Sequence, residues 1–287
     1  MSAVSKDLMS LNGTTDLTEV NQRMEILQIL ISMSKDNNKP DSDGRTLLHH
    51  AIRGGDKAEI VKYLISEVKV DINCSDNEGR TPLHYAIQEG HEEIVKYLVS
   101  EVKVDVDCLD FRGRTPLHYA IEGEHEEIVK YLISEVKVDI NCSDNEGKTP
   151  LLYALSWCKW SLAEYLLDSG ADSNISDCKD KTPLMNAVEY KFWPFDTSPS
   201  QLDIVKKLIS VSKDITTDIN KSDHTGKTAL HYAIEGKKWT AAEYLLKAGA
   251  DRDISDNAGK TPLDYVTDAD RLNHLKSIKT PSGDPIT

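Results

Sequence analysis

The chain has 287 residues, of which 39% are hydrophobic and 29% are charged, and its formal net charge is −14 at pH 7. The hydrophobic fraction is large enough for a continuous core and too large for a disordered chain. The negative charge argues against sequence-independent nucleic-acid binding and against attachment to an anionic membrane, since both need broad positive fields. No segment approaches about 18 uncharged apolar residues, so we expect no membrane insertion.

The N-terminal region begins without the apolar stretch of a signal peptide. Residues 1–15 and 281–287 carry no helical pattern, and we expect both ends to be disordered. Between them, residues 16–40 contain apolar side chains at helical spacing, which predicts an N-terminal helical cap. These side chains are Leu17, Val20, Met24, Leu27, Leu30 and Ile31.

The tetrad Thr-Pro-Leu-His, or a near variant, recurs seven times, and the steps between its threonines are 35, 34, 34, 33, 46 and 33 residues. A period of this length indicates stacked repeats that have no separate cores. We therefore predict one repeat domain over residues 41–280, with repeats that start near residues 41, 76, 110, 144, 177, 223 and 256. The tetrads begin at Thr46, Thr81, Thr115, Thr149, Thr182, Thr228 and Thr261.

The second repeat shows how one unit should fold. Residues 76–79 read Asp-Asn-Glu-Gly, which predicts a tight turn. Thr81 suits a helix N-cap, and Pro82 suits the first helical position, where its missing N–H is not needed. Apolar spacing then predicts an inner helix over 82–89, a break at Gly90 and an outer helix that packs on the stack through residues such as Ile94 and Leu98.

This order of turn, tetrad and two helices resembles the ankyrin repeat. The resemblance implies an all-α solenoid of paired antiparallel helices with projecting β-hairpin fingers, built from about seven repeats. Two departures are notable: repeats one to three carry Glu-Val-Lys-Val-Asp, at residues 67–71, 101–105 and 135–139, where the sixth has Gly249-Ala250-Asp251, which removes a glycine helix stop and adds one residue. Asp180 replaces the finger glycine of the fifth repeat, and aspartate tolerates the left-handed conformation better than most residues.

The sequence contains no recognisable catalytic motif. It lacks a Gly-rich phosphate loop, a nucleophile elbow and an H-E-x-x-H motif, so we predict neither an enzyme nor a cofactor or metal site. The family resemblance implies that the tetrad histidines are structural and bond toward the neighbouring finger. They are His49, His84, His118 and His231.

Three of the five cysteines, Cys74, Cys108 and Cys142, occupy equivalent repeat positions. Equivalent positions on stacked repeats should lie on the order of 10 Å apart, which is too far for a disulfide. We expect free thiols, which indicate a reducing compartment, either cytoplasm or nucleus.

The resemblance also implies a concave partner-binding surface made of finger tips and inner helices. By position this surface comprises Asn77, Glu78, Arg80, Gln88, Glu89, Phe111, Arg112, Arg114, Glu122, Glu146, Lys148, Lys179, Lys181 and Lys227. The fifth tetrad position adds a tyrosine ladder, and Tyr and Arg are favoured hot-spot residues. The alternative is that these tyrosines pack along the groove between repeats. The ladder includes Tyr85, Tyr119, Tyr153 and Tyr232.

A second candidate surface is aromatic. The fifth repeat is 13 residues longer than the sixth, and its extra loop, near residues 190–200, contains Phe192, Trp193 and Phe195. Alignment places Trp157, Trp160 and Trp239 at helix–helix turns of the fourth and sixth repeats. Exposed aromatic clusters mark interaction sites, whereas a loop that folds back would bury the same rings in a local core.

The leading hypothesis is a monomeric, non-enzymatic scaffold or adaptor that binds another protein, with no nucleic-acid partner. One alternative is a small-ligand or nucleotide sensor, since Trp157, Lys159 and Trp160 bring together suitable side chains. Another is a secreted effector or host-interaction factor, whose sequence would have the same physical properties.

Overall fold

The computed structural model describes residues 25, 28–29, 31, 36–54, 58–189, 199–212 and 214–280. The chain divides into two compact units, residues 1–138 and 139–287, and we describe each by itself. Most of the expected N-terminal cap, the two chain ends and the loop residues 190–198, with Phe192, Trp193 and Phe195, lie outside the described residues.

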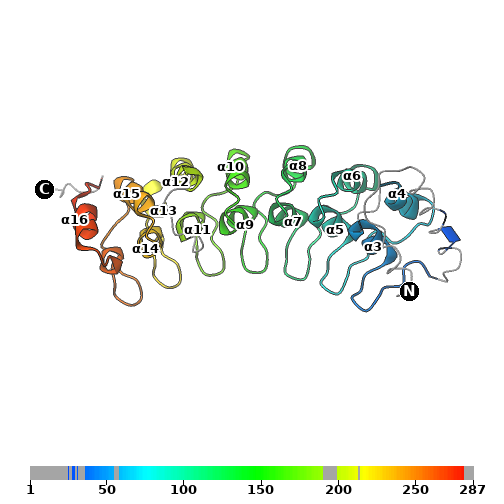
Figure 1. Cartoon of the computed structure of the whole chain (residues 1–287), viewed down its shortest axis with the longest axis horizontal. Coiled ribbons are helices and arrows are strands. Elements are labelled where there is room, and N and C mark those ends of the chain that lie inside the picture. The colour runs from blue at the N-terminus through cyan, green and yellow to red at the C-terminus, as the bar shows by residue number, and fades with distance from the viewer. Residues whose placement is uncertain are drawn as a thin grey trace. The chain divides into compact units, whose positions relative to one another are not determined.

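Within its described residues, the first unit stacks three pairs of helices. Inner helices α3 (Leu47–Arg53), α5 (Pro82–Gln88) and α7 (Pro116–Glu122) contact one another in sequence order. Outer helices α4 (Ala58–Ser66), α6 (Glu92–Lys96) and α8 (Glu126–Lys130) form a second row, drawn above the first in Figure 1. Between the rows lies an apolar core that includes Leu48, Ile87, Leu98, Ile121 and Leu132, all fully buried.

The second unit repeats this arrangement. Its inner row is α9 (Pro150–Ser156), α11 (Pro183–Glu189), α14 (Ala229–Glu235) and the short 3-10 helix η3 (Pro262–Tyr265). Its outer row is α10 (Trp160–Asp168), α12 (Pro199–Val211), α15 (Trp239–Lys247) and α16 (Ala269–Ser277). One helical turn, α13 (Ile215–Asp218), follows α12.

The inner helices begin where the tetrad predicts. Thr81 has extended backbone at the N-cap position, and Pro82 occupies the first turn. The ring Nδ1 of His84 accepts a hydrogen bond from the Thr81 N–H at 3.1 Å, which satisfies one of the donors left open at a helix start. The same capping arrangement recurs at Thr46, Thr115 and Thr228. In the last repeat, the Asp264 carboxylate replaces the histidine ring and accepts from Thr261 N–H at 2.8 Å.

The extra residue of the 34-residue repeats is absorbed at the end of the outer helix. There the chain widens into π-helical turns, η1 (Tyr97–Val102) and η2 (Tyr131–Val136). Each turn ends at a lysine in the left-handed conformation, Lys103 with φ 60° and Lys137 with φ 62°, in the position that glycine would favour. The lost glycine stop is therefore replaced by a strained lysine, whose charge lies at the negative end of the helix dipole.

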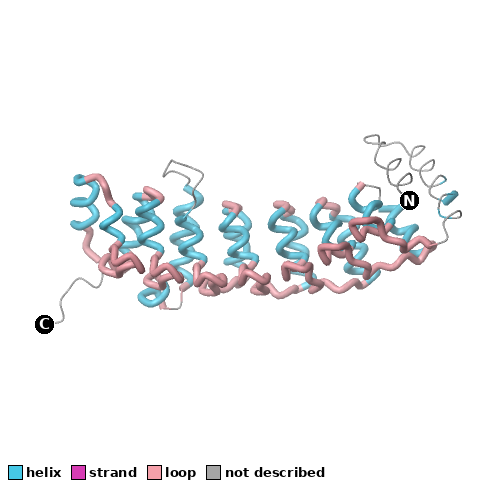
Figure 2. The backbone as a smooth tube through the Cα atoms, turned by 90° about the horizontal axis from the view of Figure 1, so that it is seen from below, coloured by secondary structure: helices cyan, strands magenta, loops and turns pink. Residues whose placement is uncertain are grey.

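The fingers are tight turns closed by backbone hydrogen bonds, such as the bond from Asp76 N to Arg80 O at 3.0 Å. In the part of the chain that the structure describes, the only β pairing is an isolated bridge between Ser222 and Thr228. Figure 2 accordingly shows helices joined by loops. As expected, Asp180 adopts a positive φ, 60°, at the fifth finger.

Candidate partner-binding site

An aspartate organises each finger, and it is buried in all repeats except the first and the fifth. In the second repeat, Asp76 Oδ1 accepts hydrogen bonds from the backbone N–H groups of Glu78 and Arg80, at 2.9 and 2.8 Å. Its Oδ2 accepts from Arg80 Nε at 2.8 Å and from the Tyr85 hydroxyl at 2.9 Å. One carboxylate thus closes the turn, holds the basic residue that precedes the tetrad and ties the finger to helix α5.

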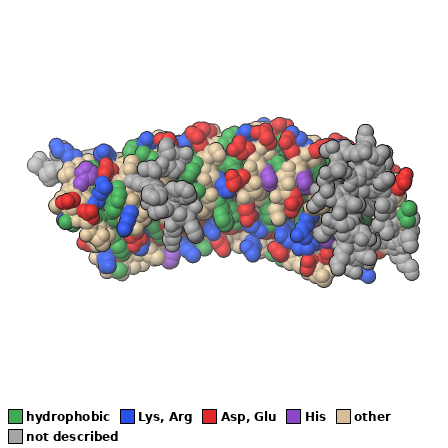
Figure 3. All heavy atoms as spheres, viewed as in Figure 1, with side chains coloured by type: hydrophobic (Ala, Val, Ile, Leu, Met, Phe, Trp, Pro, Cys, Tyr) green, Lys and Arg blue, Asp and Glu red, His purple; other side chains and the backbone are tan. Residues whose placement is uncertain are grey.

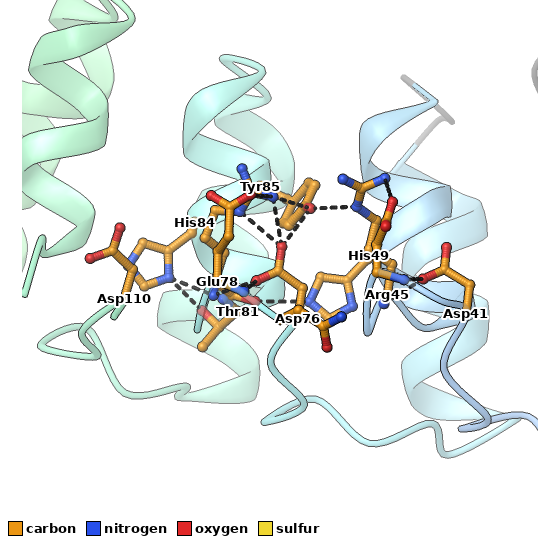
Figure 4. A network of polar contacts seen from close by, with 12 residues as sticks. Asp41, Arg45, His49, Asp76, Glu78, Thr81, His84, Tyr85 and Asp110 are labelled. Atoms are coloured by element: carbon orange, nitrogen blue, oxygen red, sulfur yellow. Dashed lines mark hydrogen bonds and ion pairs between the residues drawn. The ribbon is translucent and has the colours of Figure 1, made fainter. Parts of the chain in front are cut away.

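The tyrosine of the ladder extends this network to the preceding repeat. Tyr85 OH accepts hydrogen bonds from Arg45 Nε at 2.9 Å and from Arg80 Nη2 at 3.1 Å (Figure 4). The Tyr85 ring is 2% exposed and lies edge-on to His49. We refer to Asp76, Arg80, Tyr85 and their equivalents in other repeats as the finger-base network.

The third repeat builds the same finger-base network from Asp110, Arg114 and Tyr119. Asp110 Oδ2 accepts from Arg114 Nε at 2.8 Å and from Tyr119 OH at 2.9 Å. The Arg114 guanidinium also lies 4.4 Å from the centroid of the Tyr119 ring. The rings of Tyr85 and Tyr119 are both buried, so they offer little contact area of their own and instead fix the basic side chains.

In the second unit the network has the same plan but lysine in place of arginine. Asp144 and Asp223 accept hydrogen bonds from Tyr153 and Tyr232, which are half-buried. The fifth repeat departs from the plan, because Asn186 stands where the tyrosine would be and its amide bonds Thr182 O instead. Asp177 still closes that turn through the N–H groups of Lys179 and Lys181.

The network shifts the ionisation of its members. Burial opposes the charged form of Asp76 and Asp110, but hydrogen bonds from Arg80 and Arg114 outweigh it and lower the pKa of both carboxyls. Burial, reinforced by the hydrogen bond to Asp110, raises the pKa of Tyr119. The carboxylates are therefore ionised and the tyrosines neutral near pH 7.

The tetrad histidines join one repeat to the next, as the sequence predicted. His49 Nε2 lies 3.2 Å from Arg80 O, and His84 Nε2 lies 3.4 Å from Arg114 O. Because Nδ1 accepts from the capping threonine, Nε2 carries the proton and donates it to the carbonyl. Burial lowers the pKa of His84 to about 4, so its ring is neutral and structural at pH 7.

Around this scaffold lie the exposed candidates. In the first unit Asn77, Glu78, Gln88, Glu89, Phe111, Arg112 and Glu122 are exposed, and Arg80 and Arg114 are half-buried. In the second unit Glu146 and Lys179 are exposed, whereas Lys148, Lys181 and Lys227 are half-buried. The predicted residues thus fall into two sets. The residues of the finger-base network form a fixed layer that is shared by the repeats, and the exposed residues form a solvent layer that differs from repeat to repeat.

Several basic residues of the finger base also pair with a second carboxylate, which comes from the finger in some repeats and from the inner helix in others. Arg80 pairs with Glu78 of its own finger at 3.4 Å, and the helix position above it is the neutral Gln88. Arg114 pairs instead with Glu122 of helix α7 at 3.0 Å, and its finger carries Arg112. In the second unit Lys148 pairs with the finger residue Glu146, whereas Lys227 pairs with the helix residue Glu235. Each of these four basic side chains thus has a carboxylate partner at the surface.

Charge is mixed on the wider surface as well. On the face shown in Figure 3, the basic and acidic side chains of the described residues are interspersed. No helix within the described part of the chain is long and apolar enough to cross a membrane.

The tryptophans of the second candidate surface lie at helix starts and turns of the second unit. Trp157 caps the C-terminus of α9 and is 58% exposed, and Trp160 begins α10. Trp239 begins α15 and is half-buried, with the Arg271 guanidinium 5.2 Å from its ring centroid. The predicted turn positions are confirmed for these three residues, whereas their role as a joint surface stays a prediction.

The histidines and cysteines of the described residues bear on two kinds of site, a metal-binding cluster and a reactive cysteine. No group of three or more His, Cys, Asp or Glu side chains among them could hold a metal ion. Cys108 Sγ lies 3.8 Å from His84 Nδ1, but burial raises the pKa of this thiol to about 11, opposite to what a nucleophile needs. All five cysteines are free, as expected.

The fifth repeat contains a small pocket. It is lined by Thr182, Leu184, Leu208 and Ile219, with the Ser212–Asp218 hydrogen bond at its edge. It contains none of Trp157, Lys159 or Trp160, the residues on which the nucleotide-sensor alternative rests.

The sequence analysis missed the aspartates of the finger base. The signal was present, because an aspartate stands four residues before the basic residue in every repeat, at Asp41, Asp76, Asp110, Asp144, Asp177, Asp223 and Asp256. The sequence pattern predicted only that these residues belong to a turn. In the second and third repeats their carboxylates also orient the arginine and tyrosine side chains through hydrogen bonds.

Comparison with known proteins gives one consistent family. A family model described as ankyrin repeats in three copies matches residues 18–110, 102–177 and 196–282. An ankyrin repeat protein of Acanthamoeba polyphaga mimivirus is 41% identical over 75 residues, which is 26% of this chain and 10% of that protein. Human neurogenic locus notch homolog protein 1 is 49% identical over 51 residues, 18% of this chain and 2% of that protein. The chain thus matches a tenth or less of the length of these relatives.

Solved structures agree on the fold. The ankyrin repeat domain of Bcl-3, a member of the IkappaB protein family, superposes with a TM-score of 0.65 at 25% identity, covering 82% of this chain and 99% of that chain. A chain from the complex of a predatory endopeptidase of Bdellovibrio bacteriovorus with its immunity protein gives a TM-score of 0.58 at 27% identity, covering 71% and 100%.

Proposed function

This chain belongs to the ankyrin repeat family, which generally supplies protein–protein interaction modules, and we propose that it is a non-enzymatic scaffold or adaptor. Its partner would be another protein, bound on the surface formed by finger tips and inner helices. We further propose that it acts as a monomer in the cytoplasm or nucleus, where its five free thiols would stay reduced.

One observation carries the proposal. The buried carboxylates of Asp76 and Asp110 accept hydrogen bonds from the backbone N–H groups of their turns. The exposed side chains beside them are therefore not needed to close the turn. At equivalent exposed positions the second and third repeats then carry different chemistry, Gln88 against Glu122 and Asn77 against Phe111. A fixed frame with variable exposed side chains is what selective recognition of a protein surface needs.

The experiment is affinity capture from a native extract with two variants that change charge equally. One variant carries Glu78→Arg and Glu89→Arg on the finger and inner-helix surface. The control carries Glu126→Arg and Glu127→Arg at the exposed start of α8. We expect a protein that the wild type captures to be lost by the first variant and kept by the control. Equal retention by both variants, or equal loss, would contradict the proposed surface.

A further inference from the structure

The third finger departs from its two neighbours in the sequence. Residues 73–79 and 141–147 both read Asn-Cys-Ser-Asp-Asn-Glu-Gly, whereas residues 107–113 read Asp-Cys-Leu-Asp-Phe-Arg-Gly. Three exposed positions change in character: serine becomes Leu109, asparagine becomes Phe111, and glutamate becomes Arg112. A polar, acidic finger tip is thereby replaced by an apolar, basic one.

The backbone of the finger does not change with these side chains. Asp110 accepts from Arg112 N and Arg114 N at 2.9 and 2.8 Å, as Asp76 does in the second finger. Gly113 has φ 75° and Gly79 has φ 81°. Phe111 N donates to Glu78 O at 2.9 Å, the same step from finger to finger that Asn77 N makes to Asp43 O. The three substitutions therefore alter only what the finger presents to solvent.

The stability of the finger does not account for the substitution of apolar residues at its tip. The Asn77 amide donates a hydrogen bond to Ser42 O at 2.9 Å, which ties the second finger to the first. A phenylalanine at this position cannot make such a bond. Burial does not compensate for the lost bond, because Phe111 is 71% exposed and Leu109 is 56% exposed, and little of their apolar area is removed from water. One edge of the Phe111 ring rests against Gly79, where an added Cβ would lie 2.6 Å from its Cδ1.

The positive charge of Arg112 lies beside Leu109 and Phe111 and faces solvent. Arg112 is exposed, and its guanidinium has no hydrogen-bond or ion-pair partner among the residues that the structure describes. The nearby carboxylates are engaged elsewhere, Glu78 with Arg80 and Glu122 with Arg114. Arg112 therefore presents a guanidinium fork suited to a carboxylate from outside the chain.

We infer that Leu109, Phe111 and Arg112 form a docking anchor for a protein segment that carries a large apolar side chain next to an Asp or Glu. This inference rests on the proposed function and names the partner chemistry at one finger. Phe111 and Leu109 would cover the apolar side chain, and Arg112 would bind the carboxylate. An aromatic residue and an arginine at the centre of a contact are the residue types that dominate binding energy.

The molecule supplies its own matched variant. Leu109→Ser, Phe111→Asn and Arg112→Glu together reproduce the finger tip of the second and fourth repeats, which the fold already accommodates. The probe is a displayed library of random 12-residue peptides, selected on the full chain after depletion on this triple variant. Enriched peptides are then synthesised, and their affinity is measured by fluorescence anisotropy.

We expect enriched peptides to pair a large apolar residue with Asp or Glu and to bind the triple variant at least ten-fold more weakly than the wild type. Replacing the peptide carboxylate with lysine should abolish binding to the wild type and restore it toward Arg112→Glu. Peptides that bind both proteins equally, or that show no preference for a carboxylate, would overturn the docking anchor while leaving the proposed function intact. Failure to enrich any peptide would also overturn it, and the extract capture would then decide the proposed function separately.

Discussion

The second and third fingers of the first unit share a backbone and differ in what they expose. Both are closed by a buried aspartate that holds an arginine and a tyrosine, Asp76 in one and Asp110 in the other. Their tips nevertheless carry Asn77 and Glu78 in one case and Phe111 and Arg112 in the other. Residues that repeat from finger to finger thus support the fold, and residues that change are available for recognition.

The largest effect on stability should follow from removing an aspartate of the finger-base network. In Asp110→Ala, Arg114 Nε, the buried Tyr119 hydroxyl and two backbone N–H groups of the turn lose Asp110 as their acceptor, which should cost about 3 kcal/mol or more. The control is Asp107→Ala, which removes an exposed carboxylate from the same finger and should change stability by less than about 0.5 kcal/mol. Urea unfolding followed by circular dichroism measures both. Similar costs for the two variants would show that the buried network is not what stabilises the finger.

The next effect concerns pH and the histidine that joins the two repeats. Burial lowers the pKa of folded His84 from 6.5 to about 4, so the unfolded chain binds the proton first as pH falls. The stability that the neutral ring supplies is complete above about pH 6.5 and is lost between that pH and about 4, by roughly 2 kcal/mol at pH 5. His84→Leu, which copies Leu152 of the fourth repeat, should flatten the unfolding free energy over this range. Parallel curves for wild type and variant would contradict the assignment.

A smaller effect should appear where the outer helix of the second repeat ends. Lys103 has φ 60° and ψ 49°, a conformation that costs most L-residues about 1 kcal/mol or more. Lys103→Gly removes that strain but raises the entropy of the unfolded chain, so we expect a net stabilisation of roughly 0.5 kcal/mol. Lys96→Gly, in the regular helix α6, should instead destabilise by about 1 kcal/mol. If both substitutions destabilised equally, the left-handed stop would not be a strained position.

The smallest effect on stability should come from exchanging the solvent layer. The triple variant Leu109→Ser, Phe111→Asn and Arg112→Glu changes exposed side chains only, and we expect its unfolding free energy to stay within about 0.5 kcal/mol of the wild type. A gain of a few tenths of a kcal/mol in unfolding free energy would fit a new hydrogen bond from the introduced asparagine to the preceding finger, like the bond from Asn77 to Ser42 O. A loss above about 1.5 kcal/mol would mean that Phe111 packs structurally.

The sequence predicted the repeated local structure well because its signals are local. Thr81 and Pro82 mark the start of α5, and the predicted end at residue 89 is one residue past the observed end at Gln88. The left-handed Asp180 followed from its residue type, and the histidine links followed from the family resemblance. The π-helical turn that absorbs the extra residue before Lys103 was not predicted, because the hydrophobic pattern does not distinguish a widened turn from a longer loop.

The candidate site was less predictable, because it depends on which side chains meet across repeats. Tyr85 and Arg80 matched the composition of a contact surface, yet Tyr85 is buried beneath Arg45 of the preceding repeat. That contact joins residues 40 apart, and no local pattern encodes it. Phe111, which the family resemblance placed on the concave surface, is exposed at a finger tip. Whether it binds a partner stays a prediction.

The most direct test measures stability and binding together on the same finger. The wild type and the variant with Leu109→Ser, Phe111→Asn and Arg112→Glu would be compared in urea unfolding and in anisotropy with a selected peptide. If structural and recognition residues are separate, the unfolding midpoint stays the same and the affinity falls at least ten-fold. A joint fall in stability and affinity, or an unchanged affinity, would contradict that separation.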